Sequence, residues 1–110
     1  MSPRASAKDP SREGGVATET RTKQKLQRPK LYKVLLHNDD YTTMEFVVAI
    51  LRHAFEKSES DATAIMLHVH TRGVGVAGVY AFEIAEAKVA QVTALARDAQ
   101  FPLLTTLEPE

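Results

Sequence analysis

The hydrophobic positions change their spacing along the chain, and each change predicts a different element. Residues 31–36 form a short apolar run with the composition of a strand. Farther along, apolar residues recur every three or four positions, which is typical of an amphipathic helix: Phe46, Val47, Ile50, Leu51, Ala54 and Phe55. Thr42 and Glu45 fit a capping box, with Thr42 as the N-cap and Glu45 at the third helical position. The first helix is therefore predicted to begin just after Thr42.

The rest of the pattern predicts a second helix, a glycine-interrupted strand, a third helix and a closing strand, over about residues 60–71, 74–82, 84–98 and 103–107. Ser58 or Ser60 is available to cap the second helix, and Gly73 supplies a left-handed end. The third helix carries apolar residues on one face: Ala85, Val89, Val92 and Ala96. The order β-α-α-β-α-β predicts an α+β fold whose helices pack on a three-stranded antiparallel sheet.

Composition divides the chain into a tail and one domain. Residues 1–29 contain few large apolar side chains, so they cannot bury enough surface to offset their ordering entropy and are predicted to be disordered. Residues 1–30 contain eight Lys or Arg and three Asp or Glu, whereas residues 31–110 contain six Lys or Arg and eleven Asp or Glu. We therefore expect a basic N-terminal extension at 1–29 and one acidic domain at 30–110. The extension has no aromatic residue to stack bases, which favours a tether or docking arm over a nucleic-acid-binding segment.

Other classes of protein are excluded by what the chain lacks. It has no cysteine, which rules out disulfides, thiolate metal sites and thiol catalysis. No apolar stretch approaches the roughly 20 residues of a membrane helix, and the N-terminus lacks the apolar core of a secretory signal. A soluble protein of the cytoplasm is the expectation.

Two motifs have a functional and an ordinary interpretation. Residues 73–78 match G-x-G-x-x-G, but a helix precedes them and a β-branched run continues through them, which favours close backbone packing over a phosphate loop. Five side chains suggest a metal site: His37, Asp39, Asp40, His68 and His70. On a helix, however, His68 and His70 point about 200° apart and cannot chelate one ion. No metal or other cofactor is therefore predicted.

Apolar and polar residues around the first two helices suggest a binding pocket. Met44 and Val47 share a face of the first helix, and Met66, Val69 and His70 share a face of the second. Taken separately, each set is more typical of a core. If the helices pack side by side, the apolar residues form a pocket with a rim of Asn38, Asp40 and His70. An apolar floor beside an acceptor-rich rim suits the N-terminal residue of a polypeptide.

Four segments carry a resemblance to a known family, over Leu31 to about Glu108: YKVLLHNDDYTTMEFVVAIL, IMLHVH, GVGVAGVYAFEIAEAKVAQV and PLLTTLE. They resemble the ATP-dependent Clp protease adaptor ClpS. The resemblance implies an N-recognin that catalyses nothing. Such a protein binds substrates with Leu, Phe, Tyr or Trp at the N-terminus and hands them to the Clp ATPase and its peptidase. It also implies the β-α-α-β-α-β fold, a monomer, and a partner surface for the ATPase N-terminal domain.

The resemblance also implies roles for individual residues. The ligands of the α-amino group would be Asn38, Asp40 and His70, with Asp39 supporting the loop. The hydrophobic pocket would consist of Thr42, Met44, Val47, Met66, Val69 and Leu103. Glu83 and Lys88, at the start of the third helix, would contact the ATPase together with the N-terminal arm. Met44 corresponds to a gatekeeper that crowds ligands with a second Cβ substituent, so Ile and Val N-termini are expected to bind more weakly than Leu.

The chain departs from the family pattern at two positions. Thr43 stands where the family has proline, which would leave the 38–42 loop looser. His37 replaces an apolar residue at the end of the first strand, close to the predicted rim. Both departures bear on affinity and N-terminal preference.

Two other functions fit the sequence. One is a purely structural partner-binding domain, because the C-terminal domain of the ribosomal stalk protein has a related fold. The other is a small metal-dependent hydrolase that uses His37, Asp39, Asp40 and the two later histidines. The cluster of Asn38, Asp39 and Asp40 with His70 favours the adaptor, since a plain docking domain has no need of it.

Overall fold

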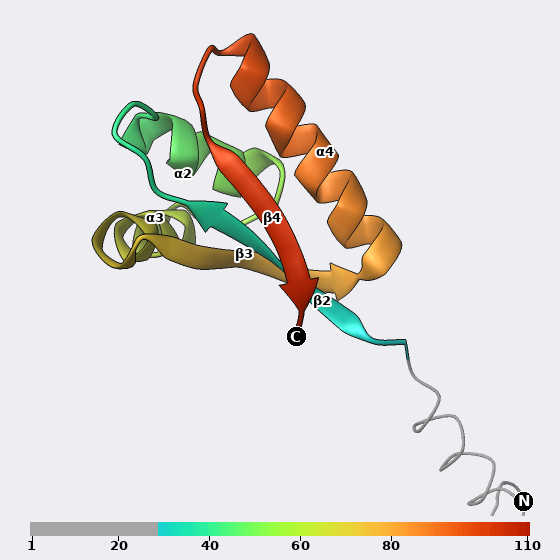
Figure 1. The fold of residues 1–110 in the computed structure, drawn as a ribbon. Helices are drawn as coiled ribbons and strands as arrows, with labels where there is room; N and C mark the ends of the chain where they lie inside the picture. Colours follow the sequence, from blue (N-terminus) through green and yellow to red (C-terminus); the bar gives the residue numbers. More distant parts are fainter. Residues whose placement is uncertain (1–28) are drawn as a thin grey trace, which may run out of the picture.

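The computed structural model describes residues 29–110, so the predicted extension at 1–29 lies outside the described residues except for Pro29. The elements are β2 (Leu31–His37), α2 (Met44–His53), α3 (Glu59–Arg72), β3 (Val74–Ala81), α4 (Phe82–Asp98) and β4 (Leu104–Pro109). Their order is the predicted β-α-α-β-α-β, and the three strands form one antiparallel sheet (Figure 1). The predicted α+β fold is confirmed.

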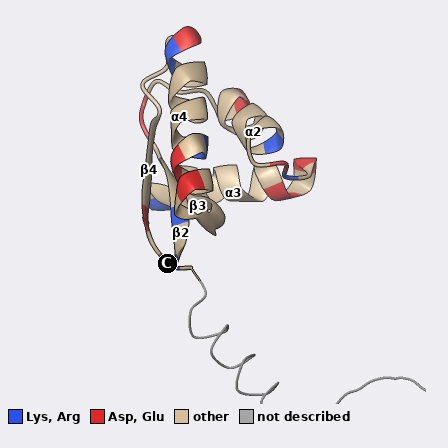
Figure 2. Ribbon diagram, turned by 90° about the vertical axis from the view of Figure 1, so that its right-hand side faces the viewer, with Lys and Arg blue, Asp and Glu red and all other residues tan. Residues whose placement is uncertain are grey.

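The sheet has β2 in its centre, in the order β3-β2-β4. β2 pairs with β3 from Leu31–Ala81 to His37–Val74, with an irregularity between Val34 and Leu35. Alternate residues of a strand face opposite sides, and the alternation of burial along β2 places Val34 and Leu36 on the covered side. The helices lie on that side of the sheet (Figure 2). The loop between β2 and α2 leaves the sheet at the end of β2, between the start of α2 and the end of α3.

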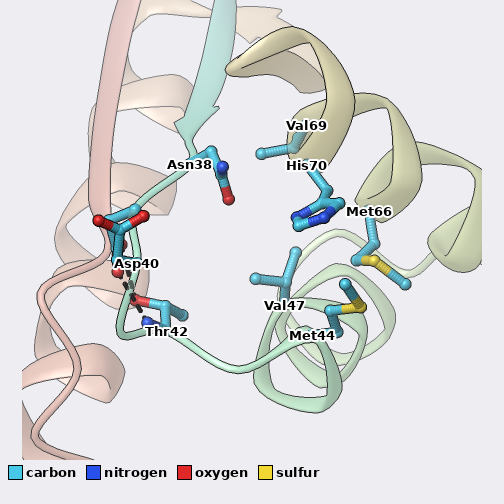
Figure 3. A pocket seen from close by; sticks show the side chains of 9 residues that line it. Asn38, Asp40, Thr42, Met44, Val47, Met66, Val69 and His70 are labelled. Carbon is cyan, nitrogen blue, oxygen red and sulfur yellow. Dashed lines mark hydrogen bonds between the residues drawn. The ribbon is translucent and has the colours of Figure 1, made fainter.

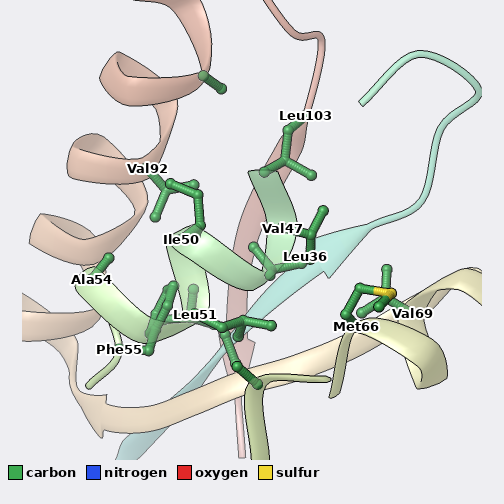
Figure 4. Packing of buried hydrophobic residues seen from close by; sticks show 14 of the residues in the cluster. Leu36, Val47, Ile50, Leu51, Ala54, Phe55, Met66, Val69, Val92 and Leu103 are labelled. Atoms are coloured by element: carbon green, nitrogen blue, oxygen red, sulfur yellow. The ribbon is translucent and has the colours of Figure 1, made fainter. Parts of the chain in front are cut away.

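The hydrophobic core lies between this face of the sheet and the three helices (Figure 4). Its largest fully buried side chains are Leu36, Leu51, Val34 and Val92. Each helix presents part of its apolar stripe to this core, as the three- and four-residue spacing predicts. Phe55, two residues beyond the end of α2, is also buried in this core, and the chain turns just after it at Glu56, where φ is 57°.

The start of α2 differs from the prediction. Thr43, not Thr42, is the N-cap, and its side chain accepts a hydrogen bond from the Phe46 backbone N–H at 3.1 Å. Glu45 is then the second residue of the helix, so the predicted capping box is wrong. Thr42 instead donates its hydroxyl to Asp39. The sequence could not separate two adjacent threonines, because either side chain can cap a helix.

The end of α3 follows the prediction. Ser58 caps its start by accepting from the Asp61 N–H, and Gly73 ends it in the left-handed region at φ 91°. Gly75, two residues on, lies in β3 where a Cβ atom would be 2.7 Å from the Cγ2 atom of Val69. The G-x-G-x-x-G stretch is therefore a helix stop followed by a strand that packs closely against α3, as the ordinary interpretation predicted.

Candidate functional site

A pocket of about 220 Å³ opens between the β2–α2 loop, the start of α2 and the C-terminal half of α3 (Figure 3). Its volume is smaller than the roughly 300–1,000 Å³ typical of sites for drug-sized ligands, and suits a single amino-acid side chain with its α-carbon. Nine residues line it: Asn38, Asp39, Asp40, Thr42, Met44, Val47, Met66, Val69 and His70. Three segments that are separate in the sequence thus contribute to one cavity.

The polar side of the pocket depends on the carboxylate of Asp39. Its Oδ1 accepts the backbone N–H groups of Tyr41 at 2.8 Å and Thr42 at 2.7 Å, and its Oδ2 accepts the Thr42 hydroxyl at 2.8 Å. Partial burial by itself raises the pKa of Asp39, but the hydrogen bonds from Thr42 and Tyr41 outweigh it and hold the pKa below its ordinary value. Asp39 therefore remains ionised and closes the loop that presents Asp40.

A second hydrogen bond fixes this loop to α3. The backbone N–H of Asn38 donates to the carbonyl oxygen of Gly73 at 2.8 Å, next to the helix turn that carries His70. The side chains of Asn38, Asp40 and His70 are exposed and line the same pocket. In Figure 3, Asn38 and His70 approach the cavity from different elements. They form an acceptor-rich rim from an amide oxygen, a carboxylate and an imidazole.

The apolar side of the pocket comes from two helices. Val47, Met66 and Val69 are 7%, 9% and 2% exposed, whereas Met44 is 43% exposed. Met44 and Met66 approach each other from α2 and α3, on the opposite side of the cavity from Asp40 (Figure 3). Met44 thus stands at the mouth of the pocket, and the other three form its apolar wall.

Most of the residues predicted for the site meet in this pocket, and three lie elsewhere. Leu103 is 6% exposed and belongs to the hydrophobic core together with Val47, rather than to the lining (Figure 4). Glu83 is exposed in the first turn of α4. Lys88 is half-buried, and its Nζ donates to the carbonyl oxygen of Ala54 while lying 5.9 Å and 5.7 Å from the ring centroids of Phe55 and Tyr80.

Three further contributors to the site were not among the predicted site residues. Thr43 caps the helix that carries Met44, the Gly73 carbonyl holds the β2–α2 loop, and Gly75 lets Val69 approach the sheet. The positive φ of Gly73 was predictable from its place after a helix, but the identity of its hydrogen-bond partner depends on the tertiary packing. The glycine-rich spacing was the available signal for Gly75.

The candidate metal ligands do not gather at one point. Among residues 29–110, no three His, Cys, Asp or Glu side chains are grouped to hold a metal ion. The Nε2 atom of His37 is instead 2.8 Å from the Thr106 hydroxyl on the neighbouring strand β4. In that same part of the chain, no helix has the length and apolar character needed to cross a membrane.

A small α+β domain with an apolar pocket and an acceptor-rich rim defines a ligand-binding protein, and comparisons with known proteins identify the family. The family model for ATP-dependent Clp protease adaptor protein ClpS matches residues 27–106. Adapter proteins ClpS of Myxococcus xanthus (strain DK1622) and Desulfatibacillum aliphaticivorans are 60% and 58% identical, over 86% and 88% of this chain and 89% and 91% of their own lengths. The chain belongs to the ClpS family of adaptor proteins of the ATP-dependent Clp protease, and as an adaptor it is not an enzyme.

A solved structure supports the same assignment. ClpS2 of Agrobacterium tumefaciens, bound to L-phenylalaninamide, is 47% identical in sequence and superposes with a TM-score of 0.73. The match covers 76% of this chain and all of that chain. The fold and the family predicted from the sequence are thereby confirmed.

Proposed function

We propose that this adaptor recognises the first residue of other polypeptides and delivers them to the Clp ATPase for degradation. The pocket would take a bulky hydrophobic side chain (Leu, Phe, Tyr or Trp), and the rim would bind the free α-amino group. The observation that carries this proposal is the meeting of an apolar wall with Asn38, Asp40 and His70 in one cavity. L-Phenylalaninamide, the ligand of the similar ClpS2, has a free amine, an aromatic side chain and an amide in place of the next peptide bond.

The chemistry of the rim matches an ammonium group. An α-amino group has a pKa of about 7.7–8.0, so it is largely protonated at neutral pH and has three N–H donors. The Asn38 side-chain oxygen, the Asp40 carboxylate and a ring nitrogen of His70 supply three acceptor positions from two segments. Asp39 would stay with the loop, because its oxygens already accept from Tyr41 and Thr42.

The energies are sufficient for specific binding. A hydrogen bond to a charged group contributes about 1.5–3 kcal/mol, and burial of a Leu or Phe side chain contributes about as much. Three such bonds and one side chain total roughly 6–12 kcal/mol before ordering costs, which corresponds to binding near the micromolar range. A peptide bond within a chain lacks the ammonium and would leave the rim unpaired, so chain interiors are rejected.

The partner and cellular setting follow from the same proposal. The exposed Glu83 at the start of α4 is the better candidate for contact with the ATPase N-terminal domain, together with the extension at 1–29. Lys88 lies five residues farther along the same helix and is engaged within the domain. The adaptor would act as a monomer in the cytoplasm, where the Clp protease degrades its substrates.

The experiment is a titration with fluorescent peptides that differ only at their first residue, followed by anisotropy. A Leu peptide should bind, and its N-acetylated form should bind at least 100-fold more weakly because acetylation removes the charge and two donors. Asp40→Asn and His70→Ala should each lower affinity about tenfold or more. Asp98→Asn, at the exposed end of α4, is the matched control and should bind as the wild type does. Equal binding of Leu and acetyl-Leu peptides would contradict the proposal and favour a structural docking domain.

A further inference from the structure

A second hollow of about 410 Å³ lies directly beside the pocket. It is lined by Met44, Glu45, Val48 and Met66, of which Met44 and Met66 also line the first pocket. The two methionines are therefore a shared wall with a cavity on each side. The second hollow is shallow and apolar except for the carboxylate of Glu45.

The α2 sequence explains why these side chains gather. Met44 and Val48 are four residues apart and lie one above the other on the helix surface, and Glu45 is adjacent to both. Glu45 is exposed. Within residues 29–110, the ion pair joins Lys33 to Glu108 and leaves the Glu45 carboxylate without a cationic partner. A ligand in the hollow would therefore meet an apolar surface with one carboxylate at its edge that pairs with no cation among the described residues.

One route out of the first pocket leads toward this hollow. Asp40 stands on one side of the first pocket, and Met44 and Met66 stand on the other (Figure 3). With the ammonium at the rim and the first side chain against Val47 and Val69, a backbone that leaves the pocket on the side away from Asp40 passes over the methionine wall. The rest of the chain then passes above the second hollow.

The alternating direction of side chains along an extended substrate determines which of its residues enters the second hollow. Successive side chains point to opposite sides and repeat every two residues, at roughly 7 Å along the chain. The second side chain therefore points away from the surface, and the third points to the same side as the first. The two cavities are separated only by the side chains of Met44 and Met66, a spacing that suits side chains two residues apart on the substrate.

We propose that the second hollow binds the side chain of the third residue of the substrate, and that Glu45 makes it selective for Lys or Arg. This inference rests on the proposed recognition of substrate N-termini. A Lys or Arg side chain has an apolar stem that can cover Met44 and Val48 and a cationic head that can reach the carboxylate. Asp or Glu at the third residue would face the Glu45 charge and is disfavoured. Glu45 is thus a specificity-determining residue for a part of the substrate beyond its N-terminal residue.

The test uses four peptides that share an N-terminal Phe and carry Lys or Glu at either the second or the third residue, with Ala at the other. Their affinities are measured for the wild type, Glu45→Gln and Glu45→Lys, and each is divided by the affinity of the same variant for L-phenylalaninamide. This ratio removes any effect on the first pocket. Glu86→Lys makes the same change of charge on the exposed face of α4, outside both cavities, and is the matched control.

The wild type should prefer Lys over Glu at the third residue by about three- to tenfold, and by less than about twofold at the second. The preference should disappear in Glu45→Gln and reverse in Glu45→Lys, but persist in Glu86→Lys. A larger preference at the second residue, or an equal effect of Glu86→Lys, would show that the hollow does not read the third side chain. Failure of L-phenylalaninamide to bind the wild type would instead contradict the proposed function itself, so the two failures are distinguishable.

Discussion

The backbone N–H of Asn38 donates a hydrogen bond of 2.8 Å to the carbonyl oxygen of Gly73. This bond joins the loop that follows the central strand to the residue that ends α3. It sets the distance between two parts of the acceptor rim that come from different elements, Asn38 and His70. The geometry of the site therefore depends on the backbone around a glycine that does not itself line the pocket.

Two glycines near this bond should respond differently to alanine. In Gly75→Ala the new Cβ would lie 2.7 Å from the Val69 Cγ2 atom, so the last turns of α3 must move and carry Val69 and His70 with them. We expect a fall in affinity for a Leu peptide of about fivefold or more, measured by anisotropy. In Gly73→Ala the Cβ meets open space, but the φ of 91° costs about 1 kcal/mol of unfolding free energy. Equal losses of affinity in the two variants, when denaturant titration shows both folded, would contradict this role for Gly75.

The ionised state of Asp39 should make the stability of the domain depend on pH. The pKa of Asp39 is lower in the folded protein than its ordinary value of about 3.9. The ionised carboxylate therefore makes its full contribution to the free energy of unfolding at pH values above about 3.9. It is lost as the pH falls below 4 through the folded-state pKa. Asp39→Asn should therefore have a lower Tm than the wild type at pH 7, and the difference should narrow toward pH 3. A difference that stays constant over this range would argue against a role for the charge; Asp98→Asn is the control.

Met44 should control the acceptance of β-branched N-terminal residues. It is 43% exposed at the mouth of the pocket, where a second substituent on the ligand Cβ would meet its side chain. We expect the wild type to bind Ile and Val peptides at least tenfold more weakly than Leu peptides, and Met44→Ala to reduce that difference. Anisotropy with the three peptides measures both ratios. Comparable binding of Ile and Leu by the wild type would rule out the gatekeeper role.

The N-cap of α2 offers a test of whether proline, which the resemblance implies for the family at this position, can replace Thr43. Thr43→Ala removes the hydrogen bond to the Phe46 N–H and should lower the unfolding free energy by about 1 kcal/mol. Thr43→Pro also loses that bond, but the φ of −75° suits proline and restriction of the unfolded chain regains about 0.4–1 kcal/mol. Urea titration should therefore place the proline variant between the alanine variant and the wild type. A proline variant less stable than the alanine variant would mean that the loop cannot accept the ring.

Glu83 and Lys88 should separate partner binding from stability. Lys88 bonds the carbonyl oxygen of Ala54 and contacts the rings of Phe55 and Tyr80, so Lys88→Met should lower the unfolding free energy by about 1–2 kcal/mol. Glu83 is exposed, and Glu83→Gln should change stability by less than about 0.5 kcal/mol while weakening the contact with the Clp ATPase N-terminal domain. Calorimetry of the adaptor with that domain measures the contact. If Lys88→Met weakens the contact and keeps the Tm of the wild type, Lys88 acts on the partner rather than within the fold.

The helix α4 shows which features local sequence pattern can predict and which it cannot. The sequence placed its apolar face correctly, because burial of Ala85, Val92 and Ala96 follows from spacing along one helix. Its start was predicted two residues late, since Ala81 is an N-cap without a side-chain hydrogen bond and leaves no capping residue to recognise. The resemblance also placed Lys88 with Glu83 on the surface expected to contact the ATPase, and local pattern gives no sign of the Ala54 carbonyl that binds Lys88, because it lies 34 positions away in the chain.

By itself, the sequence determined the order of the elements and the helix faces, because both depend on spacing between near neighbours in the chain, and its resemblance to a known family indicated the family. It also determined which side chains could form an apolar wall and an acceptor rim. Only the tertiary structure decided that Thr43 rather than Thr42 caps α2, that Leu103 packs in the core, and that Met44 and Met66 separate two cavities. The last two outcomes depend on distances between segments that are far apart in sequence, and such distances are fixed by packing across elements. The choice of cap depends instead on which of the two threonines bonds the Asp39 carboxylate.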